Sequence, residues 1–213
     1  RHRVADEFDG ETEEPVDSAG ERVADSNSVA EVPDKGGNLP RYVLFEDALP
    51  PISGTPLNTL VSNIVRIVEV EGPVLGHRLH DAYRVAYGGQ RVGKELARLL
   101  NQAIELAVRR GLIVSDNPLN EPGVKPRTFR LPTHPEVVVR ALGPRTLNLV
   151  PPSELAVHLA EYAGMDDLAD DEVFRAVLDI LGLKRLTDNV RAVLSDALKL
   201  VQNADNSVVG DPV

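Results

Sequence analysis

The sequence predicts a mainly α-helical protein, in which a winged helix of three helices and a short β-wing is followed by a second, related all-helical domain. Three observations support this fold class. Apolar residues recur at helical spacing through much of the chain. Two short β-prone segments, 112–114 and 128–131, follow the third predicted helix. The block 88–103 aligns without a gap with the block 182–197, 94 residues later. A repeat at a fixed offset is typical of one supersecondary unit used twice.

The chain divides into five predicted segments. Residues 1–40 are rich in Glu, Asp, Ser and Gly and have no periodic apolar face, so we expect a disordered acidic leader. Residues 41–56 form an extended linker, whose first residues are apolar enough to dock as a strand or an extended arm. A winged-helix domain over 57–143 and a degenerate second winged-helix-like domain over 144–201 follow. Residues 202–213 form a disordered tail.

The first domain has the element order of a winged helix. Its first helix begins after Thr55-Pro56, a cap and a first-turn proline, and ends at Gly72-Pro73. The second helix covers about 75–87. The third begins near Gly93 and ends in cationic residues followed by Gly111. Two short strands and the Pro-rich loop between them complete the order helix, helix, helix, strand, loop, strand.

The second domain repeats the helices. The first is expected to begin at Pro151–Glu154 and the second at Asp170–Glu172, where carboxylates favour the helix dipole. Thr187 is the expected cap of the last helix. No wing strands are visible in the pattern, so the second domain is predicted to be an all-helical copy.

The net charge of −10 is unevenly distributed along the chain. Residues 57–143 carry twelve Lys and Arg against eight Asp and Glu, whereas residues 1–40 carry four against eleven and residues 144–213 carry six against twelve. A basic middle therefore lies between two acidic parts. The leader could shield a basic surface, although a solvated linker is the simpler interpretation.

Composition excludes several classes of protein. The absence of cysteine excludes disulfides and thiolate metal sites, which fits a cytoplasmic location. No apolar run approaches the roughly 20 residues that cross a bilayer, so we expect no membrane partner. The first residue is Arg1 rather than methionine, and we expect the chain to be a fragment of a longer protein.

Four stretches resemble an uncharacterised domain at the C-terminal end of large superfamily 1 helicases, many of which carry a domain like the very-short-patch repair endonuclease. The stretches are Val68–Val74, Arg91–Gly93, Pro151–Leu155 and Leu181–Leu186. The resemblance covers about residues 41–200, and the chain departs from it in a long Pro-rich loop. It implies DNA or RNA transactions for a parent ATP-dependent helicase or nuclease-helicase. It assigns no catalytic residue here.

Eight residues are candidates for nucleic-acid contact, in an accessory module that binds DNA beside such a motor. Arginine, lysine and amide side chains at the start of a helix can enter a groove and contact base edges and phosphates. The third helix and its approach supply Arg91, Lys94, Arg98, Asn101 and Gln102, and the wing supplies Lys125, Arg127 and Arg130. Alternatively, this is a solvated helix face whose arginines pair with Glu95 and Glu105.

A second function class is a protein-interaction or dimerisation module without nucleic acid, which the acidic second domain favours.

Arg91 and Arg185 occupy equivalent places in the repeat, and we expect them to bond the carbonyls at the end of the preceding helix. His77 and His80 lack a third metal ligand. Residues 88–94 match the first seven positions of a phosphate-binding loop, but Glu95 occupies the eighth position, where the loop requires Ser or Thr. We therefore predict no cofactor, no metal and no enzymatic activity for this segment.

Overall fold

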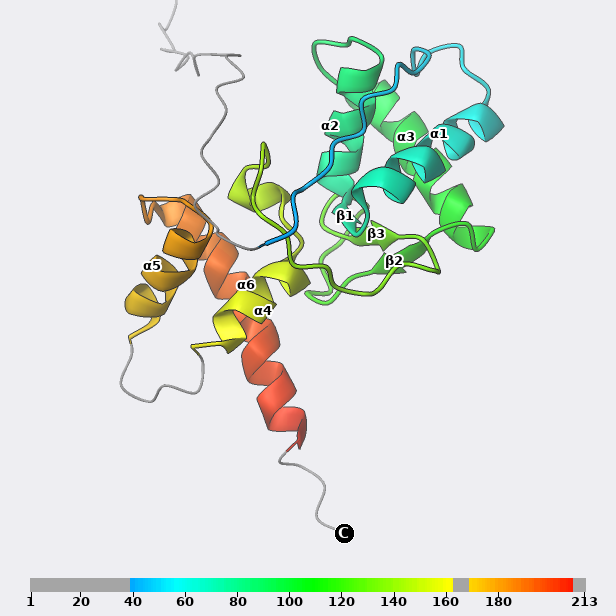
Figure 1. The fold of residues 1–213 in the computed structure, drawn as a ribbon. Coiled ribbons are helices and arrows are strands. Elements are labelled where there is room, and N and C mark those ends of the chain that lie inside the picture. Colours follow the sequence, from blue (N-terminus) through cyan, green and yellow to red (C-terminus); the bar gives the residue numbers. More distant parts are fainter. Residues whose placement is uncertain (1–38, 163–168, 209–213) are drawn as a thin grey trace, which may run out of the picture. The chain divides into compact units, whose positions relative to one another are not determined.

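The computed structural model describes residues 39–162 and 169–208 (Figure 1). This part of the chain is mainly helical and contains a small three-stranded antiparallel sheet. All of it falls within one compact unit. In chain order the elements are α1 (Leu57–Glu71), β1 (Val74–Leu75), α2 (Gly76–Ala86), α3 (Lys94–Arg109), β2 (Val114–Asp116), β3 (Thr128–Arg130), a 3₁₀ turn (Leu147–Leu149), α4 (Pro152–Ala160), α5 (Asp170–Ile180) and α6 (Asp188–Val208).

The predicted linker is an extended arm that docks onto the first three helices. It has no regular secondary structure between residues 39 and 56, yet Phe45, Leu49 and Ile52 are buried in the same core as α1 to α3. The backbone N–H of Leu49 donates to the carbonyl of Ala86 at 2.9 Å, and Figure 1 shows the arm (blue) beside α2. Apart from residues 39 and 40, the predicted acidic leader lies outside the described residues.

The sheet has the strand order β1-β3-β2, with antiparallel pairing throughout. Phe129 in the central strand lies opposite Val74 of β1 and Ser115 of β2. β1 was not predicted, because two residues are too few to show alternation. The prediction of a strand over 112–114 was two residues early, because the chain is still turning out of α3 at these positions.

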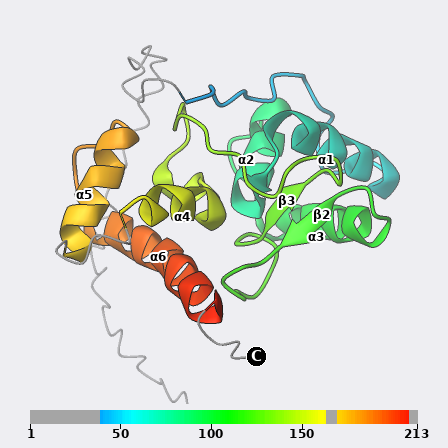
Figure 2. The same cartoon turned by 60° about the horizontal axis from the view of Figure 1, so that its bottom comes forward.

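The first hydrophobic core lies among α1, α2, α3 and the sheet (Figure 2). Its side chains come from the apolar stripes that helical spacing predicts, and Phe129 adds the contribution of the sheet. One polar pair lies inside it, since Asn63 Nδ2 donates to the Tyr83 hydroxyl at 3.1 Å. The fully buried members include Ile64, Ile67, Leu79, Tyr83, Leu100, Ile104 and Phe129.

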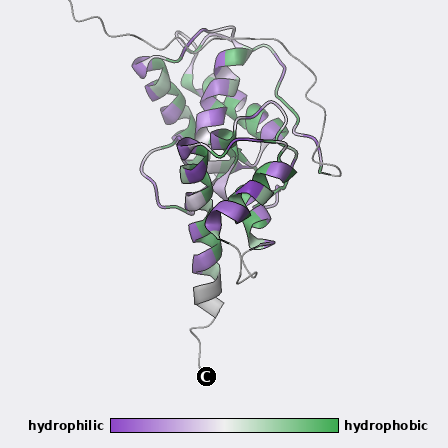
Figure 3. Ribbon diagram, turned by 90° about the vertical axis from the view of Figure 1, so that its left-hand side faces the viewer, coloured by the Kyte–Doolittle hydropathy of each residue, from purple (hydrophilic) through white to green (hydrophobic). Residues whose placement is uncertain are grey.

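A separate hydrophobic core lies among α4, α5, α6 and the 3₁₀ turn. Figure 3 shows hydrophobic and hydrophilic residues on opposite faces of the helices, as amphipathic packing requires. Among the described residues of this second copy no strand is present. α6 continues to Val208, seven residues into the segment 202–213 that was predicted as a tail. The buried apolar residues include Leu155, Leu159, Phe174, Val177, Leu194 and Ala197.

Several helix ends recur at the 94-residue offset of the sequence alignment. Both ends of α5 lie 94 residues after those of α2, and α6 begins 94 residues after α3. Gly88 and Gly182, which follow α2 and α5, both have φ of 72°, a left-handed conformation that glycine adopts without steric cost. The closing hydrogen bonds are also equivalent: Gly88 N–H to Val85 O and Gly89 N–H to Arg84 O in one copy, Gly182 N–H to Asp179 O and Leu183 N–H to Leu178 O in the other.

Candidate nucleic-acid interface

The outer face of α3 carries an exposed basic stripe, which we define as Lys94, Arg98, Gln102 and Arg109. The first three are four residues apart and therefore follow one another along the helix surface, and all four are exposed. Arg98 Nε donates to Glu95 Oε2 at 3.2 Å, but the two side chains are 58% and 81% exposed. Water screens such a pair, so the Arg98 charge stays available to an anionic partner.

Asn101 differs from its neighbours on α3. Its Oδ1 atom is buried without a hydrogen-bond partner, and its side chain lies against His80 of α2. Burial lowers the pKa of His80, Asn101 opposes the shift, and Lys125 and His77 add to it, so that the pKa is about 4. Asn101 therefore faces the contact between α2 and α3 rather than the outer surface.

Two of the predicted wing residues are held by carboxylates. Arg127, 20% exposed, donates through Nη2 to Glu105 of α3 and through Nε to the Gly123 carbonyl at 2.8 Å. Arg130, 11% exposed, donates through Nε to Asp116 at 3.0 Å. These contacts attach the wing to α3 and to β2, and they compensate both arginine charges.

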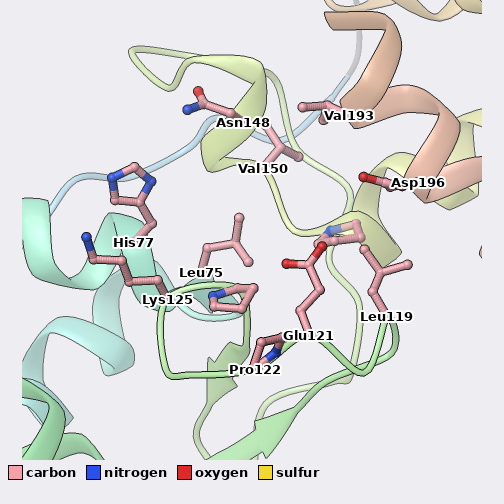
Figure 4. Close-up of a pocket in the computed structure, with 12 residues that line it drawn as sticks. Leu75, His77, Leu119, Glu121, Pro122, Lys125, Asn148, Val150, Val193 and Asp196 are labelled. Atoms are coloured by element: carbon pink, nitrogen blue, oxygen red, sulfur yellow. The ribbon is translucent and has the colours of Figure 1, made fainter. Parts of the chain in front are cut away.

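Lys125 is exposed and makes no ion pair with the described residues. Its backbone carbonyl accepts a hydrogen bond from the His77 N–H at 2.9 Å, so it lies at the start of α2. Figure 4 shows Lys125 and His77 together on one wall of a cavity. The structure thus brings Lys94, Arg98 and Gln102 onto one face, and it places Lys125 beside α2.

Arg91 and Arg185 do not have the structural role that their repetition suggested. Both are exposed, and neither makes a hydrogen bond within the described part of the chain. The carbonyl of Gly89 instead accepts from Arg84 Nη1 at 3.0 Å. The expectation was wrong: in the first copy Arg84, on the last turn of α2, bonds this carbonyl in place of Arg91. Arg91 is therefore a free cation just before α3.

A buried ionic network, which the sequence analysis missed, joins the arm to two helical groups, α1 to α3 and α4 to α6. Glu71 is fully buried at the end of α1. It accepts from the Tyr42 hydroxyl at 2.6 Å, from the Phe45 N–H at 3.0 Å, and from Arg78 Nε and Nη2 at 2.8 and 2.7 Å. Burial raises the pKa of the Tyr42 hydroxyl above its usual range, and the negative charge of Glu71 raises it further.

The second half of the network surrounds Glu154 of α4, which is 2% exposed. Arg145 donates to both of its oxygens at 3.0 and 2.8 Å, and Arg140 donates through its backbone N–H and through Nη2. Arg140 also donates to the carbonyls of Glu71 and Pro73, and both guanidinium groups lie over the Tyr42 ring. The network therefore holds α4 against the end of α1.

This network accounts for two of the stretches on which the helicase resemblance depends. Glu71 belongs to the stretch Val68–Val74, and Glu154 belongs to Pro151–Leu155. Glu69, in the same stretch as Glu71, is exposed, so a carboxylate within an apolar stretch did not by itself identify the buried residue. The arginines that pair with the two carboxylates are 7 to 14 residues away in the sequence, and this pairing does not follow from the three- or four-residue spacing within one helix.

Among the described residues no group of three or more His, Asp or Glu side chains is placed to hold a metal ion. In the same ranges, no helix is both long enough and apolar enough to span a bilayer. Comparisons with protein-family models, with curated proteins and with solved structures find no match for this chain.

Proposed function

We propose that residues 57–143 are a winged helix that binds nucleic acid through the basic stripe of α3. The chain order α1, β1, α2, α3, β2, β3 and the sheet order β1-β3-β2 support this fold. In such domains the third helix enters the major groove, and a loop between the last two strands forms the wing. The stripe supplies three cations and one amide on the helix that would enter the groove.

The internal repeat carries the proposal, because it offers the same helix with a different surface. Lys94, Arg98 and Gln102 correspond to Asp188, Ala192 and Asp196 of α6. Both helices bury the equivalent apolar positions, so the fold tolerates either set of outer residues. The cations of α3 are therefore not required for folding, and contact with an anionic partner is the simplest reason for their presence.

Within this proposal, seven of the eight candidate residues divide into four roles, and Lys125, which lies beside α2, is outside them. Arg91, Lys94 and Arg98 contact phosphates, and Gln102 contacts a base edge. Arg127 and Arg130 hold the wing in place through their carboxylate partners, and Asn101 supports the contact between α2 and α3.

The test is fluorescence anisotropy with labelled duplex DNA, duplex RNA and single strands at several salt concentrations. We expect log affinity to fall linearly with log salt concentration, and Arg98→Glu to weaken binding and reduce the salt slope by about 1. The matched control is Ala192→Glu, which places the same charge at the equivalent position of α6 and should leave binding unchanged. Equal affinities for wild type and Arg98→Glu would refute the proposal.

The second copy supports a different role. Asp188 and Asp196 of α6 stand where α3 has Lys94 and Gln102, and residues 144–213 carry twice as many acidic as basic residues. We assign it to docking on a protein partner, and the parent helicase that the resemblance implies is the first candidate. The test is a pull-down with Asp188→Lys, which should weaken capture of the purified parent without affecting DNA affinity.

A further inference from the structure

A cavity of about 500 Å³ lies between the wing loop, the start of α2 and the helices α4 and α6 (Figure 4). Its size is within the usual range for small-ligand sites. Leu75 and Val150 give it an apolar surface, and both are buried. The cavity is separate from the basic stripe of α3, since no stripe residue lines it.

Charges of opposite sign line the cavity without neutralising each other. Lys125 and His77 lie on one side and Glu121 and Asp196 toward the other, with Leu75 between them (Figure 4). Neither the Lys125 ammonium nor the Glu121 carboxylate forms an ion pair with the described residues, whereas Asp196 is paired with Lys199 at 2.6 Å. A ligand that fits these walls carries an anionic group at one end and an N–H donor at the other.

Both charged wing residues are fixed at the backbone. The Glu121 N–H donates to Asn117 Oδ1 at 3.1 Å, and Asn117 Nδ2 donates to the Glu121 carbonyl at 2.8 Å. The His77 N–H holds the Lys125 carbonyl at 2.9 Å. The network around Glu154 fixes the opposite wall by holding α4. The backbone positions of both charged residues are thus fixed before a ligand binds, which lowers the entropic cost of binding.

We propose that this cavity binds one nucleotide. Its phosphate would lie at the Lys125 ammonium and the His77 imidazole N–H, the exocyclic amino group of its base at the Glu121 carboxylate, and the plane of the base against Leu75 and Val150. Phosphate suits a lysine beside a second N–H donor, and a carboxylate accepts from a base amino group. A free nucleotide and an unpaired nucleotide of a bound strand share this chemistry. The inference extends the proposed function but involves a different surface.

The experiment is calorimetric titration of the full chain with AMP and GMP, each compared with its analogue that lacks the amino group, purine riboside monophosphate and IMP. Adenosine and guanosine test the phosphate, and a short single strand tests the strand-bound form. We expect Lys125→Gln to weaken nucleotide binding about tenfold or more while leaving nucleosides unaffected. Glu121→Gln should weaken AMP and GMP by a similar factor and leave the amino-free analogues unchanged.

The control Lys184→Gln removes an exposed cation outside both the cavity and α3 and should not alter nucleotide binding. Absence of heat with AMP and GMP at millimolar concentration would overturn the inference, and so would binding that Lys125→Gln and Glu121→Gln leave intact. Duplex binding that Arg98→Glu weakens, together with no nucleotide binding, would refute this inference alone. Nucleotide binding at the cavity without duplex binding would refute only the α3 proposal.

Discussion

The substitution Glu154→Gln tests whether the buried ionic network holds the molecule together. Glu154 is 2% exposed and accepts four hydrogen bonds from Arg140 and Arg145. Glutamine preserves the shape but removes the negative charge, so two buried guanidinium groups lose their counter-charge. Removing one partner of a buried ion pair costs about 3–5 kcal/mol. Typical domains have about 5–15 kcal/mol of stability in total, so the loss is large.

The assay is urea denaturation followed by far-ultraviolet circular dichroism. For a chain of this size, the expected loss lowers the urea midpoint by about 1–2 M. Both helical groups should unfold earlier, because the network attaches α4 to the end of α1 through Arg140. The matched control is Glu95→Gln, which disrupts an exposed pair and should change stability by less than about 1 kcal/mol. A Glu154→Gln midpoint within the error of the control would refute the reasoning.

Two further predictions concern packing and pH. Gly76→Ala should cost about 1–3 kcal/mol and lower the melting temperature, because the new Cβ would overlap the Val124 carbonyl oxygen. Gly93→Ala has open space and loses only the preference for glycine at the N-cap of α3, so it should cost less, about 1 kcal/mol or below. Equal melting temperatures for the two variants would contradict this. Burial lowers the pKa of His80 from 6.5 to about 4, so the unfolded chain binds an additional proton between these values. The free energy of unfolding is therefore expected to fall by roughly 3 kcal/mol as pH drops through that window. Denaturation at pH 7 and pH 4 should show that His80→Gln removes most of this loss of stability. The control His77→Gln, at an exposed histidine, should not. A pH dependence that His80→Gln leaves unchanged would contradict the assignment.

Local patterns were enough to predict the helices and the repeat. The spacing of apolar residues depends only on the period of an α-helix, and the glycines at 88 and 182 occupy turns that favour left-handed backbone. For the same reason the sequence predicted that Lys94, Arg98 and Gln102 lie on the outward side of α3, although it did not include Arg109. The sequence analysis wrongly placed Asn101 on the outward side of α3, because the helical period does not show that α2 packs against this position.

What the sequence by itself determined is the mainly helical class and the position of the basic residues on α3, since both follow from interactions a few residues apart. Only the tertiary structure decided which charges are free. Arg127 and Arg130 are compensated by Glu105 and Asp116, whereas Lys125 is not. The network of Glu71 and Glu154 and the cavity beside the wing also arise only in the folded chain. Their residues come from segments far apart in sequence, and burial, which gives ion pairs and hydrogen bonds their strength, exists only after packing.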